Sequence, residues 1–164
     1  MSVNRHQPHV FVLPEDDANR QMANGFTLHW SLIPRRMQVL EEAGGWLQVL
    51  ERFKTDQVVG MSQFADRFVI LLIDFDGRED RIQAVRAEIP EPLRNRVFVL
   101  GTLTQPEELR QALGTYETIG LAMAKDCQEG TNATWSHRLL SHNAVELDRL
   151  RSQVSPFLLR ETPL

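Results

Sequence analysis

Short runs of continuous hydrophobic residues punctuate the first hundred positions of the chain. Three of them stand out, at His9–Leu13, Phe68–Ile73 and Val97–Leu100, and they are rich in β-branched and aromatic residues. Continuous rather than alternating hydrophobicity is typical of strands buried on both faces, as in a parallel sheet covered by helices. A weaker run, Trp46–Leu50, follows a pair of glycines and is the candidate for a fourth strand.

Segments with helical spacing separate these hydrophobic runs. The pattern predicts helices over residues 17–32, 35–43 and 78–89; Gly44 closes the second and Pro90 ends the third. Strands and helices thus alternate between residues 9 and 101. Such alternation predicts right-handed βαβ units and an open parallel sheet.

The last third of the chain has a helical pattern. Thr104–Glu107 has the form of a capping box with proline in the first turn, which predicts a helix to Leu113. Further helices are predicted over 115–128 and 144–154. With 164 residues, about one domain is expected. We therefore expect a single domain over 1–164. Its α/β core over 9–101 has three layers and an open, mainly parallel sheet of about four strands, and a helical extension over 104–160 packs on it.

Composition and charge exclude some classes of function. The net charge is −4, so the strongly basic surface of a nucleic-acid-binding protein is absent overall. Only Lys54 and Lys125 among the 18 basic residues are lysines, and arginine is the side chain that binds phosphate or carboxylate through two parallel hydrogen bonds. The single Cys127 excludes an internal disulfide and a cysteine-based zinc site.

Hydropathy gives no sign of a membrane protein. The longest apolar run, residues 68–73, is far shorter than the ~20 residues that a membrane helix needs. The polar residues 1–9 lack the apolar segment of a signal peptide. We expect a cytoplasmic protein without membrane association.

Two carboxylates follow the central hydrophobic run. Asp74 and Asp76 stand two positions apart, and the period of a strand would place them on one side with Phe75 on the other. Ligands of open α/β sheets bind at the carboxyl ends of the strands. Two close carboxylates repel each other unless a cation or proton lies between them, and oxygen ligands suit Mg²⁺ or Mn²⁺.

A second acidic group follows the first hydrophobic run, at Glu15-Asp16-Asp17. If the two strands are neighbours, Glu15 lies near Asp74 and Asp76, and the three form a cation site with Asp16 or Asp17 in support. A purely structural interpretation stays open, because Asp16 or Asp17 could cap the following helix.

Two arginines follow the Asp pair at the start of the predicted helix. Arg78 and Arg81 are candidates for holding a phosphate beside a metal, as is Asp17 from the other strand. They could equally pair with neighbouring acids, and Asp76 could cap the helix that begins near Arg78.

The arrangement of acids and strands resembles the Toprim domain of topoisomerases, primases, recombination proteins and OLD-family nucleases. In that domain an apolar strand ends in a glutamate, here Glu15, and a later strand ends in Asp-x-Asp, here Asp74 and Asp76. The resemblance covers residues 9–101. It implies Mg²⁺ held by the Asp pair, acid/base or metal-binding work for the glutamate, and cleavage or transfer at a phosphodiester, with nucleic acid as substrate. An ATPase partner could supply the basic channel that this chain lacks.

The same residues also resemble the opening Asp-x-Asp-Gly-Thr motif of haloacid dehalogenase-type phosphatases. That resemblance implies Asp74 as nucleophile, Asp76 as general acid, Thr102 as the second-motif threonine and Lys125 as the lysine. Arg78 stands in the position of the motif threonine, and a βα unit precedes a motif that normally opens the fold.

A third hypothesis is a non-catalytic interaction protein that keeps the fold and binds a partner through its helical tail or its arginines. The acidic net charge favours this hypothesis, because a free-standing nuclease must usually offset phosphate repulsion.

Overall fold

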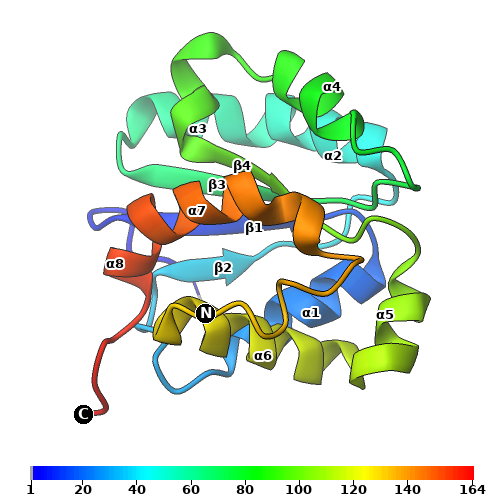
Figure 1. The fold of residues 1–164 in the computed structure, drawn as a ribbon. Helices are drawn as coiled ribbons and strands as arrows, with labels where there is room; N and C mark the ends of the chain where they lie inside the picture. Colours follow the sequence, from blue (N-terminus) through cyan, green and yellow to red (C-terminus); the bar gives the residue numbers. More distant parts are fainter. Residues whose placement is uncertain (1) are drawn as a thin grey trace.

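The computed structural model describes residues 2–164 and has an all-parallel, four-stranded sheet at its centre (Figure 1). The spatial order of the strands is β2-β1-β3-β4. Their bounds are His9–Pro14 for β1, Met37–Val39 for β2, Arg67–Leu72 for β3 and Val97–Leu100 for β4. All residues of β1 and β4 are buried, as their continuous hydrophobicity predicts. The predicted α/β class with a parallel sheet is confirmed.

The strand order places a topological switch point between β1 and β3. From β1 the chain passes first to β2 on one side, and it later returns to β3 on the other side. β1 and β3 pair in register from His9 opposite Arg67 to Pro14 opposite Leu72. The residues that follow these two strands therefore emerge side by side, where ligands bind in open α/β sheets.

Helices cover both faces of the sheet. Helices α2 (Trp46–Arg52), α3 (Val58–Gln63) and α4 (Arg81–Ala87) form one layer. A π-helical turn, Phe53–Gln57, joins the first two. The opposite layer contains α1 (Asp17–Thr27), α5 (Pro106–Leu113), α6 (Tyr116–Glu129), α7 (Ala144–Gln153) and α8 (Ser155–Leu158). Two 3₁₀ turns complete the elements, at Glu91–Arg96 and Ser141–Asn143. Among residues 2–164, no helix combines the length and hydropathy needed to cross a membrane.

Two predicted elements between residues 35 and 50 are wrong. The predicted helix over 35–43 contains strand β2, and the predicted strand Trp46–Leu50 begins helix α2. Pairing with β1, where Val10 faces Met37 and Val12 faces Val39, overrides the helix-forming residues of the first segment. The buried residues Val49, Phe53 and Gln57 recur four apart, which is the helical period that the short apolar run concealed.

The predicted capping box before α5 is also wrong. Gln105, rather than Thr104, is the N-cap residue, and no side chain bonds to the free N–H groups of this helix. The Thr104 hydroxyl is buried without a hydrogen-bond partner. Further along, α4 begins at Arg81 and not at Arg78, because a turn through Asp76 and Gly77 follows β3.

Helices α1 and α6 approach each other closely at two glycines. A Cβ on Gly120 would lie 1.8 Å from the carbonyl oxygen of Met22, and one on Gly25 would lie 2.1 Å from that of Glu117. Contacts this short are incompatible with any side chain on either glycine. Helix α6 of the C-terminal segment therefore packs on helix α1 of the α/β core with the two backbones in direct contact.

Replacing Gly120 with alanine should therefore destabilise the protein by about 2 kcal/mol, as overpacking does. Helix propensity alone predicts the opposite sign, a gain of about 1 kcal/mol. Urea unfolding monitored by circular dichroism separates the two. Ala122→Gly, at a half-buried position of the same helix, measures the propensity effect by itself. A stabilised Gly120→Ala protein would contradict the close approach.

The outer edge of β4 is closed by side chains from the segment that leads into α7. The Asn143 side chain makes two hydrogen bonds with the backbone of Gly101, accepting from its N–H at 3.1 Å and donating to its carbonyl at 2.9 Å. One turn later, Glu146 accepts a hydrogen bond from the Val99 N–H at 3.3 Å. These contacts replace the ladder of a fifth strand and satisfy buried backbone groups.

Glu146 is at the same time the centre of a buried ion network. Its carboxylate pairs with Arg86 at 2.7 Å and with Arg149, and its side chain is 5% exposed. Both arginines also donate to the carbonyl of Val97, the first residue of β4. α4, β4 and α7 are therefore joined through one acid.

Candidate functional site

The candidate site lies at the carboxyl edge of the sheet, where β1 and β3 end. Asp74, two residues beyond β3, is buried with 9% of its surface exposed. Its Oδ1 accepts a hydrogen bond from Asn19 Nδ2 at 3.1 Å and another from the Thr102 hydroxyl at 3.2 Å. Residues from α1 and from the loop after β4 thus converge on one carboxyl group.

Asp16 shares this position with Asp74. One Asp16 oxygen caps α1 by accepting the Asn19 N–H at 2.9 Å, as the sequence allowed. Asn19 links this acid to Asp74, because its backbone N–H donates to Asp16 while its side-chain amide donates to Asp74 Oδ1. The pair that the fold brings together is therefore Asp16 with Asp74.

Burial and the neighbouring acids hold Asp74 in its protonated form. Loss of solvent around the carboxyl, followed by the charge of Asp16, raises the pKa of Asp74 to about 8; the charge of Glu15 adds to this effect and the Asn19 hydrogen bond opposes it. A carboxyl that stays neutral near pH 7 among other carboxyls indicates a place where positive charge is favoured.

Glu15 lies beside Asp74, as adjacency of the two strands predicted. Its Oε2 accepts a hydrogen bond from the backbone N–H of Asp74 at 2.7 Å. Burial, followed by the charges of Asp16 and Asp76, raises the pKa of Glu15, while the Asp74 N–H lowers it. Glu15 thus fixes the backbone at Asp74 and adds negative charge to this edge.

Asp76 has different contacts from Asp74. A left-handed backbone at Asp76, with φ of 51°, turns the chain away from the strand direction. The strand period of two, which predicted that Asp74 and Asp76 lie on one side, therefore does not apply at Asp76. Asp76 pairs with Arg81 at 2.7 Å, and Arg81 lies over the ring of Trp46. Phe75 does point to the opposite face, into the core beneath α2 and α4.

The two remaining candidates are at the surface. Arg78 pairs with Asp80 at 3.2 Å, and both side chains are largely exposed. Asp17 accepts a hydrogen bond from Gln21 and lies 3.7 Å from Arg20. Arg78 and Arg81 therefore pair with neighbouring acids, the alternative that the sequence left open.

Asn19 is the site residue that sequence reasoning missed. Its side chain is completely buried, its amide nitrogen binds Asp74, and its Oδ1 has no hydrogen-bond partner. Its position three residues after the N-cap Asp16 was the available signal, because it places Asn19 on the first turn of the helix next to the strand end. A buried acceptor without a donor indicates room for a cation or a donor group.

Two carboxyl groups, those of Asp16 and Asp74, could hold a metal here. Asn19 turns its Nδ2 toward Asp74, so its Oδ1 would contribute only if the amide were reversed. Within residues 2–164, no group of three or more His, Cys, Asp and Glu side chains is arranged to hold an ion. The joint metal-binding role of Glu15, Asp74 and Asp76 therefore stays a prediction.

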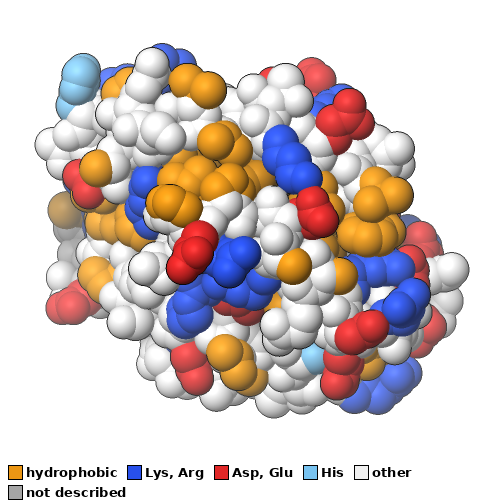
Figure 2. Space-filling view, turned by 90° about the horizontal axis from the view of Figure 1, so that it is seen from above, with side chains coloured by type: hydrophobic (Ala, Val, Ile, Leu, Met, Phe, Trp, Pro, Cys, Tyr) orange, Lys and Arg blue, Asp and Glu red, His pale blue; other side chains and the backbone are white. Residues whose placement is uncertain are grey.

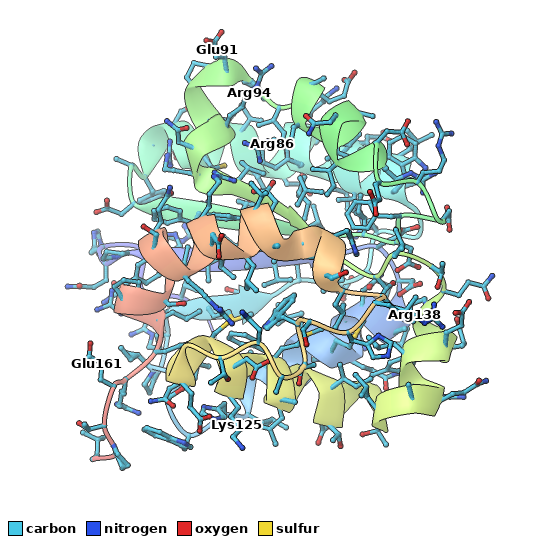
Figure 3. All side chains as sticks on the ribbon, viewed as in Figure 1. Arg86, Glu91, Arg94, Lys125, Arg138 and Glu161 are labelled. Atoms are coloured by element: carbon cyan, nitrogen blue, oxygen red, sulfur yellow. The ribbon has the colours of Figure 1, made fainter. Side chains whose placement is uncertain are left out.

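Neither Lys125 nor the face formed by α2, α3 and α4 gives the acidic edge a continuous basic surface. Lys125 lies on α6 and points away from the sheet (Figure 3), where it lines a surface hollow with His29 and Glu129. On the face formed by α2, α3 and α4, basic and acidic side chains are interspersed (Figure 2), as in the pair of Lys54 with Glu88 at 2.6 Å. This face offers no continuous track for a polyanion.

Comparison with models of known families, with curated proteins and with solved structures found no match to the chain. The class is accordingly set by the fold and the site alone. This is an open, parallel α/β protein with an acidic cluster around the buried Asp74 at its topological switch point.

Proposed function

We propose that the acidic edge binds a divalent cation and performs phosphoryl chemistry. The observation that carries this proposal is the buried Asp74 at the end of β3, whose carboxyl is linked to Asp16 through Asn19. Mg²⁺ or Mn²⁺ would take the place of the proton on Asp74, and both ions favour carboxylate oxygens as ligands. Bound there, the ion would offset the charge of a phosphate group.

The best-supported form of this chemistry is transfer of a phosphoryl group to Asp74. The carboxylate would attack phosphorus, a new O–P bond would form, and the bond to the leaving group would break with its electron pair; water would later release phosphate. The observation that favours this form is the Thr102 hydroxyl on Asp74 Oδ1, because a donor at this point can bind a phosphate oxygen. Thr102 is also the residue that the phosphatase resemblance gives as the second-motif threonine, although Lys125 is not part of the site.

The phosphodiester-processing form is the second candidate. It is supported by the neighbouring positions of Glu15 and Asp74, which agree with the resemblance to the Toprim domain. The net charge of −4 opposes a free-standing nuclease. A nucleic-acid substrate would therefore need a partner, such as an ATPase, that supplies basic surface.

The test is incubation with a small phosphoryl donor, acetyl phosphate, with and without Mg²⁺, followed by intact-mass measurement. We expect the wild type to gain one phosphoryl group only with Mg²⁺, and the label to be released by hydroxylamine, which cleaves acyl phosphates. Asp74→Asn should remain unlabelled. Asp76→Asn is the matched control and should be labelled, since Asp76 pairs with Arg81 instead.

Cation binding is measured separately by thermal unfolding. At 100 times Kd, Mg²⁺ or Mn²⁺ should stabilise the wild type by about 2.7 kcal/mol, and Asp74→Asn should lose this shift. A shift without labelling, together with cleavage of DNA or RNA, would favour the phosphodiester form. Absence of any shift would contradict the cation site and leave the interaction-protein hypothesis.

A further inference from the structure

An apolar cavity lies between the sheet and the layer that contains α1, α6 and α7. Its volume is about 60 Å³, whereas protein interiors have few voids larger than a water molecule. Apart from Thr102 and the backbone of Gly101, its lining is entirely hydrophobic. The single proton of the Thr102 hydroxyl is already shared between Asp74 Oδ1 and the carbonyl of Thr104. Water entering the cavity would find too few polar partners to be held there.

The lining is adaptable as well as apolar. Met22, Met37 and Met123 contribute to it from α1, β2 and α6. Methionine side chains are unbranched and polarisable, so they can make room for an apolar guest. A cavity of about 150 Å³ accepts benzene or xenon; by proportion, the present cavity fits a group of about two or three carbon atoms, or one xenon atom.

The cavity and the acidic edge share two of their walls. Helix α1 carries Asn19, which binds Asp74, and one turn later Met22 and Ala23, which line the cavity. Thr102 belongs to both places, since it lines the cavity and donates to Asp74. A guest that moves α1 or the Thr102 loop would therefore change the contacts of Asp74.

We infer that this cavity is a binding site for a small apolar group, such as a short alkyl chain, and that its occupancy alters the acidic edge through α1 and Thr102. Binding follows from the cavity alone. The consequence for cation or phosphoryl chemistry rests on the proposed function.

Xenon is the probe, and methyl NMR of methionine is the measurement. Under xenon pressure, the methyl signals of Met22, Met37 and Met123 should shift with saturation. Met61, which is buried in the opposite core, is the internal control and should not shift. Absence of saturation, or an equal shift of Met61, would overturn the binding site.

Filling the cavity is the matched test. Ala23→Leu adds an isopropyl group at the cavity wall and should abolish the xenon response, and Val12→Ile is a smaller change that should weaken it. Ala84→Leu makes the same alanine-to-leucine substitution on the exposed face of α4 and should leave the xenon response intact. A full response in both filled variants would overturn the assignment of the guest to this cavity.

The effect of the guest on the acidic edge is measured without any metal. The backbone N–H signals of Asn19 and Asp74, neither of which lines the cavity, should move when xenon saturates it. Unchanged N–H signals with saturated methyl shifts would overturn the link while leaving the binding site in place. Because no cation or phosphoryl donor is present, failure of the proposed function gives a different pattern of results.

Discussion

Replacing Glu146 with alanine should lower the free energy of unfolding by about 3 to 5 kcal/mol, the range seen when one partner of a buried ion pair is removed. The carboxylate is the common partner of Arg86 and Arg149, which are only about one-quarter exposed. Without it, two partly buried guanidinium groups lie next to each other and the Val99 N–H loses its acceptor. Urea unfolding followed by tryptophan fluorescence measures the loss.

Glu108→Ala is the matched control for this substitution. Glu108 also pairs with an arginine, Arg138, but the distance is 3.6 Å and both side chains are exposed. Exposed pairs contribute about 0 to 1 kcal/mol. If the two alanine variants had equal stability, Glu146 would not be the centre of the network.

Asp74→Asn should stabilise the protein, and the gain should grow with pH. Asparagine keeps an oxygen that accepts from Asn19 and Thr102, and its amide stays neutral beside the charge of Asp16. The folded-state pKa of about 8 lies above the ordinary value of 3.8. The neutral carboxyl therefore favours the folded state most at acidic pH, and this contribution is lost as the pH rises from about 4 through 8.

The difference between wild type and Asp74→Asn should be small near pH 4 and reach about 3 to 5 kcal/mol above pH 8, since each pKa unit corresponds to about 1.4 kcal/mol. Chemical unfolding of both proteins across this range measures it. Burial lowers the pKa of His9, His29 and His142, but the three histidines are present in both proteins and their effect cancels. Asp76→Asn is the control at an exposed acid and should differ little from wild type. A pH-independent difference would show that Asp74 is ionised throughout.

The central strands could be predicted because their sequences allow few alternatives. The residues of β1, β3 and β4 form continuous apolar runs that only a doubly covered parallel sheet can bury. The region from 35 to 50 could not be predicted in the same way. β2 is only three half-buried residues long, and its strand conformation comes from pairing with β1 rather than from its own pattern.

The site was predicted in its position but not in its composition. Strand adjacency correctly placed Glu15 next to Asp74. The separation of Asp76 from Asp74 comes from the turn at Asp76 and Gly77, which a strand period cannot describe. Asp16 is linked to Asp74 through Asn19 on helix α1, a contact that depends on the folded helix. Asn19 was beyond a search for acids, because its role is to contact a carboxyl and not to supply one, and Thr102 was reached only through the phosphatase resemblance.

The closure of the β4 edge has a consequence for synthesis of the chain on the ribosome. All four strands are complete at Leu100, whereas Asn143 and Glu146 emerge more than forty residues later. During that interval the apolar β4 would present open backbone groups to any neighbouring chain. Premature termination before α7 should therefore yield products that associate through β4. In the cell, such fragments would be clients for chaperones.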